Sequence, residues 1–528
     1  MIRNPLKMKK IYAALVAGTM LVPAACSDYL DVNRNPNGPE TVSANLYLPP
    51  MLHWMVTSPQ FEGRFIGRYA QEWTLPGVSL STWDRMGYDP SSDNGAQQWR
   101  DVYWNLGQNL VDMMNLARTE ERWDLLGVGE ILKAWGWLVL TDMHGEIIVK
   151  QAIDQNRFAF DYDTQETAYQ EVLSLLDSAI TNLQRTDGAV SATYMAKGDK
   201  IYNGDRVKWL KYAYGLKAIA LNHFSNKASY KPADVIAAVD KSFASNSDDA
   251  LMTYPGISPG LEDLNFLGWS RNNLRGYRQT QFIVNLMNGT QFGVTDPRMS
   301  RMLAPTPSGE FRGLDINVAG ISLTASTTPN NFMGGVGTSA PAGGARYIFD
   351  DKSKIPAVTY AQLQFVKAEA AYRMGDKALA LTAYRNGISA HFDFVNARNQ
   401  DAGQSPSQIT AAEKAEFLAS PEIVPAASGL TLTHIMSQKY IAQWGWGHNE
   451  IWMDLRRYHY TDIDPASGRQ VFPGFAPPTN LYPDNGGKLV WRIRPRFNSE
   501  YVWNREGLDK IGGLALDYHT VPTWIIQP

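Results

Sequence analysis

YAQLQFVKAEAAYRMGDKALALTAYRNGISAHF, residues Tyr360–Phe392, is the stretch that decides the fold. Small and aromatic side chains recur in it at the spacing of one face of an α-helix. The pattern is interrupted once, at Met374–Asp376, where Gly375 can supply the turn that ends a helix. The stretch therefore predicts two helices that are joined by a short turn and packed as a hairpin.

Helical periodicity also dominates the chain outside this stretch. Asp163 begins one such segment as a predicted N-cap, with Glu166 three residues later in a capping-box pattern. Residues 129–142 and 205–224 have the same period and are more apolar than surface helices usually are. The opening stretch resembles a tetratricopeptide hairpin, but no strict repeat runs through the chain. We predict an all-α fold built from degenerate helical hairpins.

Two regions interrupt the helical pattern. Residues 74–95 are rich in Gly, Pro and Ser and contain Trp83 and Tyr88, which we expect to be exposed. Residues 254–346 carry many Gly, Pro, Ser, Thr and Asn residues and few periodic stretches. Long irregular segments in a compact protein are usually functional or disordered, and binding residues often lie on loops held by a rigid frame. The sequence therefore predicts a helical scaffold packed against a loop-rich, ligand-binding half.

The amino terminus has the layout of a secretory signal peptide. Lysines precede an apolar run of twelve residues, IYAALVAGTMLV at 11–22, and small residues follow it. A helix of this length rises about 18 Å, which is too short to span a bilayer. Cys26, the only cysteine of the chain, lies directly behind the segment. We predict a signal peptide over 1–25, an anchor and tether over 26–45, and a single domain over 46–528.

Cys26 resembles the cysteine of bacterial lipoproteins that is acylated after the signal peptide is cut. Pro23 stands where that pattern prefers Leu, and Leu21 lies two residues further back. Asp28 and Asp31 resemble the acidic export signal of surface lipoproteins in the Bacteroidetes group. The resemblance implies a lipid-anchored protein exposed on the outer membrane, where several acyl chains would anchor it stably. The alternative is an ordinary signal peptide with a chance free cysteine.

The composition excludes several classes of protein. A single cysteine excludes disulfides within the chain and thiolate metal clusters. A net charge of −3, from 52 acidic and 49 basic residues, offers no basic surface for nucleic acid. The 16 Trp and 25 Tyr side chains each combine a flat apolar face with a polar edge. Such residues suit both a packed core and a wet binding surface.

The motifs that suggest catalysis or a metal are incomplete. GISPG at 256–260 has the spacing of a nucleophile elbow, but Pro259 lacks the N–H that the oxyanion hole needs. GVGTSA at 335–340 has the spacing of a dinucleotide loop without the flanking strand and helix. The eight histidines are scattered and have no second ligand at helical spacing. We predict no enzyme, no cofactor and no metal site, and we leave open a glycosidase whose carboxylate pair meets only in the fold.

The segment Gln438–Tyr460 is the densest cluster of aromatic and charged residues, and it has two interpretations. In the first, Trp444 and Trp446 form a ligand platform. In the second, which the periodicity favours, the segment is a packed helix. The second interpretation buries Ile441, Trp452 and Leu455 and pairs Arg456 and Arg457 with carboxylates.

Eight motifs, each weak alone and specific in this order, make the chain resemble the SusD/RagB-type nutrient-binding lipoproteins, and within them the second SusD-like subgroup. The motifs are CSDYLDVNRNPNGP (26–39), ILKAWGWLVLTDMHGEI (131–147), FDYDTQETAYQEVLSLLDSAI (160–180), YNGDRVKWLKYAYGLKA (202–218), VTDPRM (294–299), FVKAEAAYRMG (365–375), QKYIAQWGWGHNEIWMDLRRY (438–458) and RIRPRFNSEYVWN (492–504). One departure is Ile148, where the family usually shows Pro.

The resemblance implies an all-helical fold in which four tetratricopeptide-like hairpins cradle an irregular ligand-binding half. It also implies a partner, a SusC-type TonB-dependent transporter, over which the lipoprotein acts as a hinged lid. The ligand sites of the family vary and lie in loops.

Loop aromatics flanked by short polar side chains are our predicted ligand site, because such rings can stack on sugar rings while their neighbours supply hydrogen bonds. The predicted residues are Trp83, Tyr88 and Asp89, with Trp269, Asn272 and Tyr277 as a second group.

The leading functional hypothesis is a surface lipoprotein that captures oligosaccharide or polysaccharide and passes it to the transporter. The alternatives are a peptide-binding member of the same family, a helical glycoside hydrolase, and a purely structural lid.

Overall fold

The computed structural model describes residues 42–76, 81–89, 93–256, 263–317, 324, 326–339, 345–404 and 406–528. The predicted signal peptide, Cys26 and most of the tether lie outside the described residues, as do residues 257–260 of the GISPG motif. None of the helices in the described ranges is long and apolar enough to cross a membrane.

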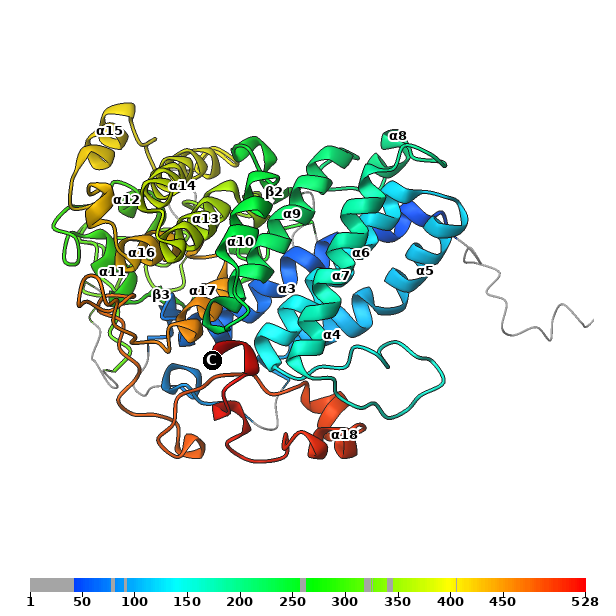
Figure 1. Cartoon of the computed structure of the whole chain (residues 1–528). Coiled ribbons are helices and arrows are strands. Elements are labelled where there is room, and N and C mark those ends of the chain that lie inside the picture. Colours follow the sequence, from blue (N-terminus) through cyan, green and yellow to red (C-terminus); the bar gives the residue numbers. More distant parts are fainter. Residues whose placement is uncertain are drawn as a thin grey trace, which may run out of the picture.

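The described chain is mainly helical, as predicted, and Figure 1 shows its longer helices packed side by side. The helices are α3 (Leu48–Tyr69), α4 (Gln97–Arg100), α5 (Gly107–Thr119), α6 (Trp123–His144), α7 (Gln165–Gln184), α8 (Ala192–Ala196), α9 (Arg206–His223), α10 (Pro232–Asp240), α11 (Gln281–Met287), α12 (Met299–Met302), α13 (Tyr360–Met374), α14 (Lys377–Arg398), α15 (Ala411–Ala419), α16 (Leu432–Gln443), α17 (His448–Arg457) and α18 (Arg505–Lys510).

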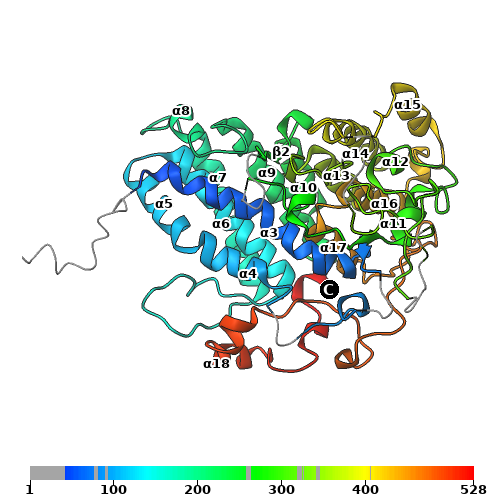
Figure 2. The same cartoon turned by 180° about the vertical axis from the view of Figure 1, so that it is seen from behind.

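Consecutive helices pack as hairpins, which form the scaffold. The pairs α6/α7, α9/α10 and α13/α14 are in contact, and α7 and α13 each also pack on α9. Figures 1 and 2 show these pairs following one another across the molecule. The turn predicted between α13 and α14 is confirmed, because Gly375 ends α13 with a φ of 89°. A side chain is strained in this left-handed conformation, whereas glycine adopts it freely.

The start of α7 differs by one residue from the prediction. Thr164, not Asp163, is the N-cap, and its hydroxyl accepts a hydrogen bond from the backbone N–H of Thr167. The carboxylate of Asp163 instead accepts the backbone N–H groups of Val149 and Lys150, both at 2.9 Å. Asp163 thereby holds the segment after α6 against the start of α7, a role that sequence spacing does not reveal.

Figure 1 draws the largely irregular carboxy-terminal chain, in orange and red, along one edge of the helical row. Two small antiparallel sheets join distant segments of the chain. β1 (Trp73–Thr74) pairs with β3 (Arg278–Gln279), and β2 (Ala250–Met252) pairs with β4 (Ile355–Val358). The first sheet brings the two predicted loop regions together.

The segment Gln438–Tyr460 packs into the core, which confirms the second interpretation, but as two helices, α16 and α17. The rings of Trp444 and Trp446 are both buried, so they form no exposed platform. Arg457 pairs with the carboxylates of Glu369 and Asp454, as predicted. The prediction for Arg456 is wrong, because its guanidinium donates to the backbone carbonyls of Asp142 and Trp491.

Candidate ligand-binding cleft

The first two predicted ligand residues are buried, so the expectation that they are exposed is wrong. Trp83 is 6% exposed and Tyr88 is 3% exposed. The Trp83 ring packs against Phe65, Tyr69 and Tyr88, with ring centroids 4.9, 5.3 and 5.3 Å away. The loop folds back on α3 because these rings bury more apolar surface together than apart.

The other predicted residues are more accessible. Asp89 and Asn272 are exposed, and Trp269 and Tyr277 are half-buried. Arg275 covers one face of Trp269, with its guanidinium carbon 3.8 Å from the ring centroid. None of the six residues lines the cleft described next. Their role in ligand binding stays a prediction.

A different set of aromatic residues lines an open cleft of about 770 Å³, which is a volume typical of small-molecule sites. Its walls come from α4 and the residues after it, from the segment between α6 and α7, and from the segment before α18. The lining residues are Trp99, Arg100, Tyr103, Trp104, Ile148, Ala152, Ile153, Phe160, Arg496, Ser499 and Glu500. Figures 1 and 2 show the α6–α7 segment extending beside α18.

Two π-helical segments contribute lining residues to this cleft. η3 (Asp101–Leu106) carries Tyr103 and Trp104, and η9 (Phe497–Tyr501) carries Ser499 and Glu500. π-Helical turns are rare and occur frequently at functional sites. Trp104 is 75% exposed, although it lies in a wall of large aromatic residues. A tryptophan held open in this way is available to a ligand.

The wall formed by η3 is held rigidly. The Tyr103 hydroxyl donates to the carbonyl oxygen of Ile148 at 2.7 Å and accepts the Ile148 N–H at 2.9 Å. The Tyr103 ring lies 4.9 Å from Trp99 and 5.6 Å from Trp137, measured between centroids. Burial, followed by the nearby Glu500 carboxylate, raises the pKa of Tyr103 well above its usual value, so the hydroxyl keeps its proton.

The wall that contains Arg496 and Glu500 is held by hydrogen bonds to charged groups. The Glu500 carboxylate accepts from the Tyr162 hydroxyl at 2.6 Å and from the Asn504 amide at 2.9 Å. Arg496 pairs with Asp93 at 2.8 Å. Charge-assisted bonds of this kind fix side-chain positions better than neutral ones. The cleft therefore combines an open aromatic face with pre-positioned polar groups.

The buried carboxyl group of Glu62 binds the backbone at the start of α4. Glu62 of α3 is fully buried, and its Oε1 accepts the backbone N–H groups of Gln97 and Gln98. Burial raises the pKa of Glu62 to about 8, against the lowering effect of those two N–H groups, and the nearby Asp101 adds to the rise. Burial also raises the pKa of Asp101 to about 6.

We expect Glu62→Gln to stabilise the protein at neutral pH. In the wild type, the protonated Glu62 carboxyl leaves the free energy of unfolding at its maximum below the unfolded pKa of 4.5. That free energy falls as pH rises towards the folded pKa of about 8, because ionising the buried group is unfavourable. Glutamine keeps the oxygen that accepts from Gln97 and Gln98 and has no proton to lose. The variant should gain about 3 kcal/mol in free energy of unfolding at pH 7 and nothing at pH 4. Urea denaturation between pH 4 and pH 7 measures this difference. If the free energies of unfolding of wild type and variant differ by the same amount at every pH, the prediction is wrong.

The chemistry of the cleft favours binding over bond cleavage. Trp104 offers a flat face for the C–H side of a sugar ring, and Arg100, Ser499 and Arg496 offer hydrogen bonds. A glycosidase needs two carboxyl groups across the scissile bond. Within the described residues that line the cleft, Glu500 is the only carboxylate. The lining therefore gives the glycoside hydrolase alternative no support.

Sequence reasoning missed Trp104 because it lies in a strongly periodic stretch, QQWRDVYWNLGQNL, at 97–110. Aromatic residues in such a stretch usually belong to the core, as Trp99 does here. A usable signal was the density of the stretch, in which three large aromatic residues lie within six positions. An ideal helix cannot turn all three rings to one buried face.

Comparison with known proteins gives the family. A SusD-like family model, described as "Starch-binding associating with outer membrane", matches residues 37–483. No curated protein sequence gives a significant match. Among solved structures, a SusD/RagB family protein from Bacteroides thetaiotaomicron is 23% identical with a TM-score of 0.65, over 92% of this chain and 99% of that chain.

Two further structures with the same fold are described as chitin-binding proteins. A chitin-binding protein is 21% identical with a TM-score of 0.67, over 92% of this chain and 100% of that chain. A chitin-binding SusD homolog from Flavobacterium johnsoniae is 21% identical with a TM-score of 0.64, over 91% of this chain and 96% of that chain. At 21–23% identity, the likeness to these structures shows only a shared fold. The family assignment rests on the family model, which matches most of the chain.

SusD-like proteins are binding proteins and not enzymes, in agreement with the sequence prediction. The helical hairpins, the order of the motifs and the family match all lead to one assignment. This chain belongs to the SusD-like family, whose members are described as starch-binding proteins associated with the outer membrane.

Proposed function

We propose that this protein captures oligosaccharides in the cleft around Trp104 and delivers them to a SusC-type TonB-dependent transporter. Capture is supported by one observation above all: Trp104 is 75% exposed at the wall of a cleft of about 770 Å³. Aromatic rings stack on the apolar faces of sugars, and the flanking polar groups select hydroxyl positions. The starch-binding description of the family supports the same ligand class.

The cell-surface location and the transporter partner are further parts of this proposal. A basic and apolar leader that ends at the sole cysteine supports a signal peptide and a lipid anchor at Cys26. The outer-membrane description of the family supports the same location. A lipid anchor would hold the protein where a transporter can receive what it binds.

Trp104→Ala should weaken oligosaccharide binding. Base–aromatic stacking, which is the nearest measured analogue, contributes about 1–3 kcal/mol per ring, so we expect a loss of about fivefold to over a hundredfold in affinity. Maltohexaose and chitohexaose represent the starch and chitin that related proteins are described as binding. Isothermal titration calorimetry of wild type and variant with each oligosaccharide measures the change in affinity.

Trp503→Ala is the matched control. Trp503 is 77% exposed, as accessible as Trp104, but it does not line the cleft. The control should bind like the wild type. Equal affinities for Trp104→Ala and the wild type would refute the cleft as the binding site. Binding of neither oligosaccharide, together with binding of peptides, would refute the ligand class.

A further inference from the structure

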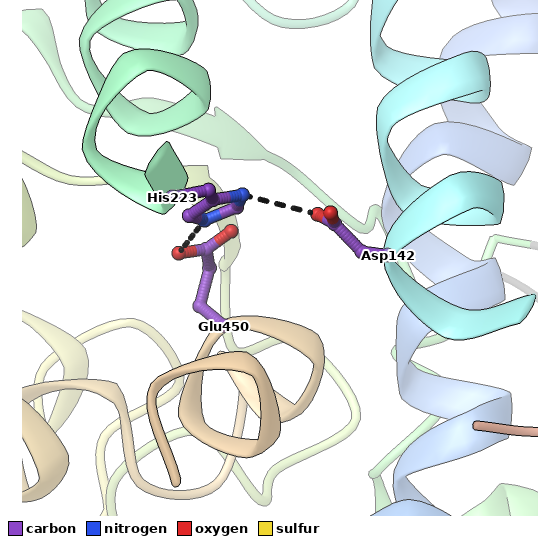
Figure 3. Close-up of side chains that lie close together, drawn as sticks. All are labelled: Asp142, His223 and Glu450. Carbon is purple, nitrogen blue, oxygen red and sulfur yellow. Dashed lines mark hydrogen bonds and ion pairs between the residues drawn. The ribbon is translucent and has the colours of Figure 1, made fainter. Parts of the chain in front are cut away.

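Three ionisable side chains from three helices meet in the scaffold, and none of them lines the cleft. Figure 3 shows His223, the last residue of α9, between Asp142 of α6 and Glu450 of α17. The His223 Nδ1 lies 3.4 Å from Asp142 Oδ2, and the Nε2 lies 3.2 Å from Glu450 Oε2. The Tyr169 hydroxyl donates to Asp142 and lies 3.0 Å from His223 Nδ1. One nitrogen of the ring is therefore held by Asp142 and Tyr169, and the other faces Glu450.

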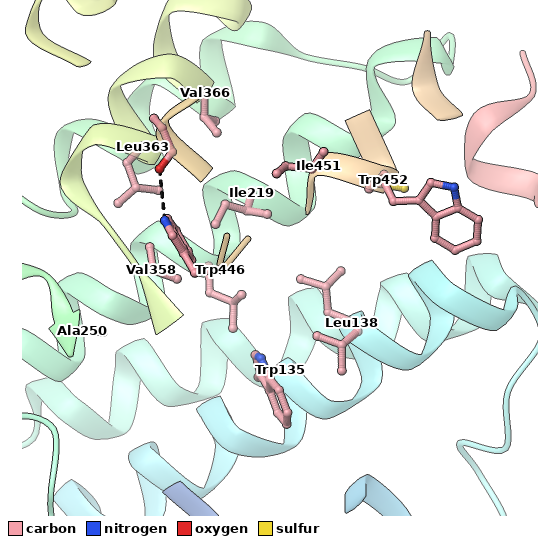
Figure 4. Packing of buried hydrophobic residues seen from close by; sticks show 14 of the residues in the cluster. Trp135, Leu138, Ile219, Ala250, Val358, Leu363, Val366, Trp446, Ile451 and Trp452 are labelled. Atoms are coloured by element: carbon pink, nitrogen blue, oxygen red, sulfur yellow. Dashed lines mark hydrogen bonds between the residues drawn. The ribbon is translucent and has the colours of Figure 1, made fainter. Parts of the chain in front are cut away.

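A small cavity of about 60 Å³ adjoins this cluster, and both Asp142 and Glu450 line it. Figure 4 shows three of its apolar wall residues, Trp135, Ile219 and Trp446. Gln362 also lines the cavity, is 1% exposed, and has a buried Oε1 without a hydrogen-bond partner. The buried Oδ1 of Asn449, another lining residue, likewise has no partner.

The two buried oxygens that lack a hydrogen-bond partner at this cavity are both acceptors. An orphaned acceptor in a low-dielectric interior costs about 1–3 kcal/mol. Two such oxygens and two carboxyl-bearing residues in the lining of one cavity favour a guest that carries positive charge. A cavity of this size has room for an ion and its water ligands but not for a sugar ring.

We propose that this cluster is a binding site for a divalent metal ion of the zinc type, with His223 Nε2 and Glu450 as its protein ligands. In a tetrahedral zinc site, ligand atoms about 2.0–2.1 Å from the metal lie about 3.3 Å from one another, close to the 3.2 Å between Nε2 and Oε2. Asp142 and Tyr169 would fix the ring tautomer through Nδ1, in the arrangement known as a carboxylate–histidine–metal triad. Water in the cavity would complete the coordination and would donate hydrogen bonds to the two amide oxygens.

The competing state is an ion triad, in which a protonated His223 pairs with both carboxylates. Burial alone would lower the pKa of His223, but Glu450 and Asp142 raise it to about 9. In this state the protonated ring pairs with both carboxylates, but the Gln362 and Asn449 oxygens still lack hydrogen-bond partners. A divalent ion brings one more positive charge than the proton that it displaces and can reach those oxygens through bound water.

Metal analysis of the purified protein tests the proposal. Protein stripped with a chelator is dialysed against micromolar Zn²⁺, or against Ca²⁺ as an oxygen-preferring ion, and bound metal is measured by mass spectrometry. We expect one Zn²⁺ per chain and no bound Ca²⁺. Glu450→Gln and His223→Gln should lose the zinc, and Asp142→Asn should bind it about 10–100-fold more weakly.

His459→Gln is the matched control, because His459 also faces a carboxylate, Asp462 at 2.8 Å, but both side chains are nearly half exposed. This variant should keep the zinc. Pulsed electron paramagnetic resonance of the Cu²⁺-loaded wild type needs no variant and should show coupling to an imidazole nitrogen. No bound zinc, or zinc retained by folded Glu450→Gln, would overturn the proposal in favour of an ion triad only.

Discussion

Trp83→Ala is expected to destabilise the protein by about 3–5 kcal/mol, which is the usual cost of removing a buried tryptophan. Trp83 is 6% exposed and contacts three aromatic rings, of which Phe65 and Tyr69 belong to α3. Its indole also fills the space next to Gly95, where a Cβ would lie only 2.6 Å from the ring. Alanine would leave a cavity between α3 and the loop, because the rings around it are held by their own contacts.

Urea denaturation at constant pH measures this loss. Trp104→Ala is the matched control, since it removes the same side chain from an exposed position and should change the free energy of unfolding by less than about 0.5 kcal/mol. If Trp83→Ala unfolds at the same urea concentration as the wild type, the loop does not pack on α3 as the structure shows.

Glu369→Gln should also cost about 3–5 kcal/mol, because it would leave a buried arginine without its main counter-charge. Glu369 of α13 and Arg457 of α17 are both fully buried and form two contacts, at 2.8 and 3.0 Å. The same carboxylate accepts from the Tyr458 hydroxyl at 2.7 Å and from the Asn222 amide of α9 at 2.8 Å. Burial alone would raise the pKa of Glu369, but the Arg457 guanidinium holds it well below its usual value.

The control for Glu369→Gln is a carboxylate–cation pair at the surface. Asp161 and Lys510 lie 2.8 Å apart, and each side chain is 57% exposed. Water screens this pair, so Asp161→Asn should cost far less stability than Glu369→Gln. Thermal and urea denaturation of the two variants measure the contrast. Equal losses would show that the Glu369 carboxylate is not the centre of the buried network.

The helices were largely predictable because their signals are local. Periodicity placed α6, α7, α9, α13 and α14, and Gly375 marked the turn between the last two. Boundaries were less certain, as the shift of the α7 N-cap from Asp163 to Thr164 shows. Both residues can cap a helix, and the choice depended on contacts of Asp163 with Val149 and Lys150 across the α6–α7 segment.

The sequence by itself determined the helical class and the family order of motifs, because these depend on residue types and short spacings. Only the tertiary structure decided which aromatic residues are open. Trp83 lies in a polar loop and is buried by α3, whereas Trp104 lies in a periodic stretch and is exposed in a π-helical segment. The tertiary structure also brings together Asp142, His223 and Glu450 from three helices. Burial and charge pairing depend on partners in other segments of the chain, and no local pattern records where those partners come to lie.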